Sequence, residues 1–142
     1  MSVQGPYWAR AVEVARHDPR AIAARDIPAS PGVYIWFRDG EPIYVGEAKG
    51  AKGLKSRLRA HLAKGIDLSR STLRASVAVA ELGVTRAFAR QRPSVMTADQ
   101  ITHVNDWLSG CELGWHERAT PASAHELEVS LRNEWTPPLN IL

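Results

Sequence analysis

Residues 31–61, PGVYIWFRDGEPIYVGEAKGAKGLKSRLRAH, are the stretch that decides the fold. Apolar residues alternate with other residues along 33–37 and again along 43–46, which is the two-residue period of half-buried strands. Arg38-Asp39-Gly40 separates the two runs, and a three-residue loop with glycine in the left-handed conformation commonly joins antiparallel strands. The stretch therefore predicts a β-hairpin.

A loop of this length also predicts the register of the hairpin. It would pair Ile35 with Ile43, and it would place Tyr34 directly opposite Tyr44 on the face away from the aliphatic side chains. The Cβ atoms of two such opposite residues lie roughly 5 Å apart. An aromatic pair of this kind can be purely structural, so the hairpin alone does not assign it a function.

The composition indicates one soluble domain. The 142 residues are 44% hydrophobic and 23% charged, which is enough for one domain with its own core and too little for two ordinary ones. No apolar run approaches the roughly 18 residues of a membrane span, and no secretory leader is evident. The single cysteine, Cys111, cannot form an internal disulfide. We therefore expect a cytoplasmic protein without a membrane partner.

Helix and strand signals lie on both sides of the hairpin. Helical patterns cover about 6–16, 18–25, 54–64, 67–82, 97–108 and 121–135, and strand patterns cover 85–96 and 111–118. Thr97 with Gln100 is a capping box, and Gly83 is a helix C-cap signal. These signals predict an α+β domain with a small, mostly antiparallel β-sheet flanked by helices.

Five residues in a fixed order carry a family resemblance. Tyr34 lies in a Gly-Val-Tyr and Tyr44 in a Tyr-Val-Gly, and Arg57 follows on the next predicted helix. Glu128 lies on the last predicted helix, and Asn140 ends a Pro-x-x-Asn after it. The chain resembles the GIY-YIG nuclease family in this order and spacing. Valine replaces isoleucine in both tripeptides, a change that differs by one methylene.

The resemblance covers residues 31–61 and 128–140 of what we expect to be a single domain over 1–142. It leaves about 1–27 as an N-terminal helical extension and about 66–120 as an unmatched insertion. The resemblance implies an α+β nuclease domain that hydrolyses phosphodiester bonds with the help of a divalent cation.

The implied roles agree with the chemistry of the residues. Arg57 would neutralise the charge of the phosphate oxygens, because a guanidinium never loses its proton. Glu128 would hold one Mg²⁺ or Mn²⁺ ion per active site. Tyr34, with Tyr44, would be the general base or would position the water. A tyrosine base requires a phenol pKa below its usual value of about 10, lowered by the cation, by Arg57 or by Lys49.

Two further residues are expected at or beside the site. His61 lies one helical turn beyond Arg57, where it would contact a phosphate or a tyrosine if it is not simply structural. Asn140 is expected to tie the C-terminal segment to the site. His125 is expected to lie on the surface.

Positive charge gathers in the middle of the chain although the net charge is only +3. The expected phosphate contacts are Lys49, Lys52, Lys55, Arg59, Arg70 and Arg74. The prediction is a DNA endonuclease that cuts one strand per active site, is a monomer in solution and can pair on DNA. Two alternatives stay open: a nucleic-acid-binding module that does not cleave, and a nuclease acting on RNA or single strands.

Overall fold

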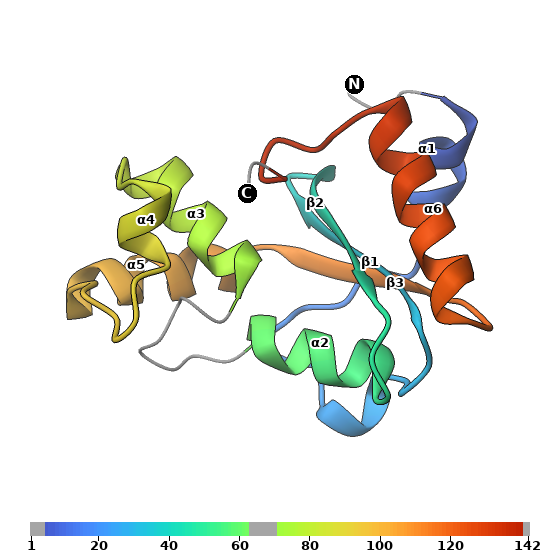
Figure 1. Cartoon of the computed structure of the whole chain (residues 1–142), viewed down its shortest axis with the longest axis horizontal. Helices are drawn as coiled ribbons and strands as arrows, with labels where there is room; N and C mark the ends of the chain where they lie inside the picture. Colours follow the sequence, from blue (N-terminus) through green and yellow to red (C-terminus); the bar gives the residue numbers. More distant parts are fainter. Residues whose placement is uncertain (1–4, 63–70, 141–142) are drawn as a thin grey trace.

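The computed structural model describes residues 5–62 and 71–140, except for the side chains of Ala24, Ala60 and His61 (Figure 1). Its centre is a three-stranded antiparallel sheet in the order β2-β1-β3, so β1 is the central strand. The strands are β1 (Gly32–Arg38), β2 (Glu41–Ala48) and β3 (Glu112–Glu117). The predicted α+β class is confirmed.

Helices cover both faces of this sheet. They are α1 (Pro6–Ala11), the 3-10 helix η1 (Ala24–Asp26), α2 (Gly53–Leu62), α3 (Thr72–Leu82), α4 (Arg86–Ala89), α5 (Ala98–Ser109) and α6 (Pro121–Glu134). Helices α1 and α6 lie together on one side of the sheet, and α2 lies on the other (Figure 1). Helices α3, α4 and α5 form a group beside α2 (Figure 1). No described helix is long and apolar enough to span a bilayer.

The turn of the hairpin is one residue shorter than predicted. Arg38 pairs with Glu41, so only Asp39 and Gly40 form the turn. Both have positive φ, 52° and 82° respectively, which is the backbone that a two-residue type I′ turn requires. Asp and Gly are among the residues that tolerate this conformation best.

The predicted register of the two tyrosines is wrong. A β-bulge follows Trp36, which pairs with Tyr44, and it makes Ile43 an extra residue in β2. Tyr34 therefore lies opposite Gly46 and is only a diagonal neighbour of Tyr44. The shorter turn and the bulge each move the pairing by one residue. Because the total shift is two, Tyr44, Val45 and Gly46 keep their predicted faces, whereas the bulged Ile43 packs against the cluster on the tyrosine face.

Both faces of the hairpin are buried, although the sequence predicted that the tyrosine face would be free of large aliphatic neighbours. The aliphatic face packs against α1 and α6 through Val33, Ile35, Phe37, Val45, Trp8 and Leu131. The tyrosine face packs against α2 and α3 through Trp36, Leu54, Leu58, Leu73 and Val77. The tyrosines are therefore part of the main hydrophobic core.

Three predicted elements are shorter or different. The first helix ends at Ala11 rather than near residue 16, and the helix expected at 18–25 is wrong: a turn at 19–21 is followed by the short η1. The strand expected at 85–96 is wrong: the Thr85 side chain caps the short helix α4 there. The capping box of Thr97 and the left-handed C-cap at Gly83 are confirmed.

Helix α1 is attached to the C-terminal end of α6. The indole N–H of Trp8, which is fully buried, donates to the carbonyls of Leu131 at 2.7 Å and Trp135 at 2.9 Å. The carboxylate of Glu134 accepts the backbone N–H groups of Tyr7 and Trp8, both at 3.0 Å. Segments far apart in the sequence thus hold α6 against the sheet, with the site glutamate on its middle turns.

Candidate functional site

A directed chain of hydrogen bonds joins Arg57, Tyr34 and Tyr44. The two phenol rings are stacked, with centroids 6.2 Å apart and planes at 28°. Arg57 hydrogen-bonds to Tyr34, and it must be the donor because a guanidinium has no acceptor. The two phenols are hydrogen-bonded to each other, and because the oxygen of Tyr34 accepts from Arg57, we infer that its O–H donates to Tyr44. This bond favours the ionised form of Tyr44 over that of Tyr34. The order is Arg57 to Tyr34 to Tyr44.

The surroundings do not lower the pKa of either phenol below its usual value. Burial, and then the charge of Tyr44, raise the pKa of Tyr34 far above 10. Burial also raises the pKa of Tyr44, but Arg57 and the hydrogen bond from Tyr34 oppose this rise. The lowered pKa that a tyrosine base needs therefore does not come from the protein groups alone. Tyr44 is the phenol whose ionised form its neighbours support better.

Gly46 makes room for the tyrosine chain. A Cβ atom at this position would overlap the phenol oxygen of Tyr34. Gly32 is similarly restricted, because a Cβ there would overlap the carbonyl oxygen of His116 and the side chain of Leu54. The glycines of the two tripeptides are thus explained by close packing of the site, not by turns.

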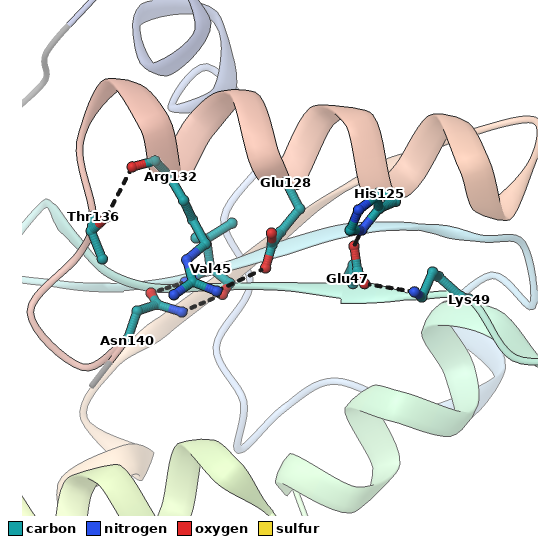
Figure 2. A network of polar contacts seen from close by, with 8 residues as sticks. All are labelled: Val45, Glu47, Lys49, His125, Glu128, Arg132, Thr136 and Asn140. Carbon is teal, nitrogen blue, oxygen red and sulfur yellow. Dashed lines mark hydrogen bonds and ion pairs between the residues drawn. The ribbon is translucent and has the colours of Figure 1, made fainter. Parts of the chain in front are cut away.

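Glu128 lies on α6, the helix that covers the aliphatic face of the sheet, and its side chain reaches towards the edge strand β2 (Figure 2). Its side chain is 13% exposed, and one guanidinium nitrogen of Arg132 lies 3.5 Å from one of its oxygens (Figure 2). Burial raises the pKa of Glu128, Arg132 lowers it, and the charge of Glu47 raises it further. Glu128 in turn raises the pKa of Tyr44, which places its charge near the acceptor end of the hydrogen-bond chain.

Asn140 binds the backbone of the edge strand β2. Its amide oxygen accepts the N–H of Val45 at 2.9 Å, and its amide nitrogen donates to the carbonyl of Val45 at 2.7 Å (Figure 2). Leu139 adds a backbone bond to the carbonyl of Ile43 at 2.9 Å. The side chain thus satisfies polar groups that a neighbouring strand would otherwise bind, and it holds the C-terminal segment beside the site.

A second carboxylate, Glu47 on β2, pairs with His125, which precedes Glu128 by one helical turn on α6. Glu47 lies 3.0 Å from the ammonium of Lys49 and 2.9 Å from Nδ1 of His125 (Figure 2). Burial opposes ionisation, but the hydrogen bonds from Lys49 and His125 hold the pKa of Glu47 below its usual value. Lys49, one of three groups proposed from the sequence to lower a tyrosine pKa and also an expected phosphate contact, pairs with this carboxylate. His125 is exposed, as expected, although it is not unpaired.

The sequence reasoning missed Glu47 and Arg132 as neighbours of the site. Period-two alternation places Glu47 on the same face of β2 as Val45, which is the face that α6 covers. Arg132 follows Glu128 by four residues, the spacing of helix neighbours. Both signals were present in the sequence, but the sequence does not show that α6 packs against this face of β2.

The expected phosphate contacts differ in their exposure. On and before α2, Lys49, Lys52 and Arg59 are exposed and Lys55 is partly exposed. The prediction for Arg74 is wrong, because this side chain is 1% exposed inside the α3–α5 group and donates to Asn105 at 2.7 Å. Arg70 and the side chain of His61 lie outside the part of the chain that the structure describes.

The donor set around Glu128 fits a hard cation held by few protein ligands. Among the described residues, no group of three or more histidine, cysteine, aspartate or glutamate side chains could hold a metal ion. Mg²⁺ typically keeps several waters and binds proteins through one or two carboxylates plus substrate phosphates. A partly buried glutamate beside two tyrosines and an arginine fits this mode of binding.

Comparison with known families agrees with this geometry. A family model described as the GIY-YIG catalytic domain matches residues 35–142, which is most of the chain. The chain therefore belongs to the GIY-YIG family. The match includes residues 66–120, between the two stretches on which the sequence resemblance rested, and it begins just after the first tripeptide. No solved structure matches the chain. Membership of this family implies a nuclease, and hence a nucleic-acid substrate.

Proposed function

We propose that this protein is a divalent-metal-dependent endonuclease that hydrolyses DNA, one strand per active site. The observation that carries the proposal is the ordered chain from Arg57 through Tyr34 to Tyr44, with Glu128 at its acceptor end. Four residues from β1, β2, α2 and α6 converge here. A module that only binds nucleic acid would need a basic surface and not this buried arrangement.

In this mechanism Tyr44 is the general base, which takes a proton from the attacking water. Its oxygen already accepts a hydrogen bond from Tyr34, which stabilises the phenolate and leaves Tyr44 the better base of the two. Tyr34 keeps its proton, because burial strongly disfavours its ionised form. Arg57 holds Tyr34 in place and has further N–H donors available for the non-bridging oxygens of the scissile phosphate.

Glu128 would hold the divalent cation. When bound, the cation supplies positive charge that stabilises the leaving oxygen and favours ionisation of nearby groups. The raised pKa of Glu128 means that the carboxyl takes up a proton at a higher pH than an exposed glutamate does. Cation binding should therefore weaken as the pH falls towards that value.

Helix α2 is the proposed DNA-binding surface. Lys52, Lys55 and Arg59 accompany Arg57 on this helix or just before it, and two of the three are fully exposed. Contacts from these side chains to backbone phosphates would place the duplex along α2 without reading its sequence.

The test is cleavage of supercoiled plasmid, linear duplex, single-stranded DNA and RNA, with Mg²⁺ and with EDTA. We expect Mg²⁺-dependent cleavage of duplex DNA, with open-circular plasmid accumulating before linear plasmid. Arg57→Met should abolish it, whereas Arg10→Met, an exposed arginine on α1, should not. Cleavage by the Arg57 variant at the wild-type rate would refute the proposed mechanism. Faster cleavage of RNA or of single-stranded DNA would replace duplex DNA as the proposed substrate.

A further inference from the structure

Arg132 is a second guanidinium at the site, and it comes from the opposite side to Arg57. Arg57 lies on α2, whereas Arg132 lies on α6, one turn after Glu128. Figure 2 shows its side chain reaching from α6 to β2, between Glu128 and Asn140. Its charge, like that of Arg57, lowers the pKa of Tyr44. The guanidinium of Arg132 therefore lies at the edge strand β2, close enough to Tyr44 for its charge to act on that phenol.

We propose that Arg132 is a second phosphate-binding arginine of the active site, which Glu128 holds in place until cation and substrate bind. This inference rests on the proposed function, because it assigns a further residue to the same site. A guanidinium on each side of the tyrosines would contact the scissile phosphate and its neighbour along the strand from two directions.

The pair between Arg132 and Glu128 is suited to exchange. The two charged atoms are 3.5 Å apart, through a single nitrogen, and the arginine side chain is 41% exposed. Such a pair is weak compared with a buried bidentate one. A divalent cation held by Glu128 would compete with the guanidinium for this carboxylate, so cation binding would release Arg132. The released guanidinium of Arg132 would then be close to a scissile phosphate bound beside Tyr44.

A simpler role for Arg132 is to stabilise α6, since glutamate followed by arginine four residues later is a favourable helix pair. The two roles predict different coupling between Glu128 and Arg132 in DNA binding. If Arg132 only stabilises the helix, its removal has the same small effect on DNA affinity whether or not Glu128 is charged. If Glu128 restrains Arg132, removing the charge of Glu128 increases the contribution of Arg132 to DNA affinity.

The decisive experiment is a double-mutant cycle on metal-free DNA affinity, measured by fluorescence anisotropy of a labelled duplex in EDTA. Glu128→Gln should tighten binding. Arg132→Met should weaken binding little in the wild-type background and about tenfold more in the Glu128→Gln background. Arg10→Met should have the same small effect in both backgrounds. Equal effects of Arg132→Met in the two backgrounds would overturn the inference.

Two further measurements separate this inference from the proposed function. Calorimetric Mg²⁺ binding without DNA should be unchanged or tighter in Arg132→Met, because a competing cation has been removed; weaker binding would indicate a purely structural role.

Cleavage should fall roughly 10²-fold in Arg132→Met, as for loss of a transition-state contact, and recover partly in Arg132→Lys. If wild-type protein does not cleave, the proposed function fails while the binding cycle still tests Arg132. If it cleaves and Arg132→Met equals Arg10→Met, only the Arg132 assignment fails.

Discussion

Removal of one oxygen atom, in Tyr34→Phe, tests the directed hydrogen-bond chain. The ring of Tyr34 is 1% exposed and would stay in the core, so the change deletes only the hydroxyl. Tyr44 then loses the donor that favours its ionised form, and Arg57 loses its acceptor in the protein. We expect a folded protein with a less acidic Tyr44 and a less firmly placed Arg57.

The size of the effect follows from the charge on the acceptor. A hydrogen bond to a charged group contributes about 1.5–3 kcal/mol, and one pKa unit corresponds to about 1.4 kcal/mol. The pKa of Tyr44 should therefore rise when Tyr34 no longer donates. If the ionised Tyr44 is the base, the rate below its pKa should fall by roughly 10- to 100-fold.

The assay is single-turnover cleavage of duplex DNA with Mg²⁺ over a range of pH. The rising limb of the pH–rate profile should move to higher pH in Tyr34→Phe, because a higher pKa requires a higher pH for the same ionised fraction. Tyr7→Phe is the matched control, since Tyr7 is 50% exposed on α1 and lies outside the tyrosine pair. An unchanged limb and rate in Tyr34→Phe would refute the directed chain, and thermal denaturation would show whether the variant is folded.

Three other predictions concern the metal, the DNA surface and the C-terminal segment. Glu128→Gln should abolish Mg²⁺ binding in calorimetry, whereas Glu126→Gln, an exposed glutamate on the same helix, should leave it unchanged; intact binding in the Glu128 variant would remove this residue from the metal site. Reversing Lys55 and Arg59 to glutamate should weaken binding to all DNA sequences alike. It should also flatten the slope of log K against log salt by about two, and an unchanged slope would exclude them as phosphate contacts. Asn140→Ala should lower the free energy of unfolding by about 1–3 kcal/mol, measured by urea denaturation, because two hydrogen bonds to the edge of β2 are lost; a change within error would show that solvent replaces them fully.

The sequence alone determined the fold class and named the candidate site residues. Local signals were sufficient for this, because period-two alternation marks strands and capping residues mark helix ends without knowledge of distant contacts. The capping box at Thr97, the C-cap at Gly83 and the strand at 112–117 are examples that the structure confirms. The order of the two tripeptides and Arg57 also identified the family before any geometry was known.

Tertiary structure decided what lies against each face. The bulge at Ile43 changed the tyrosine register but left Tyr44 and Val45 on their predicted faces, which an alternation pattern cannot detect. Burial of Arg74 depends on α5, a helix that follows it by more than twenty residues, so its charge alone suggested the wrong role. The direction of the hydrogen bond from Tyr34 to Tyr44 depends on packing against α2. Residue types and spacing name the groups of a site, but distances, burial and donor direction arise only when distant segments pack together.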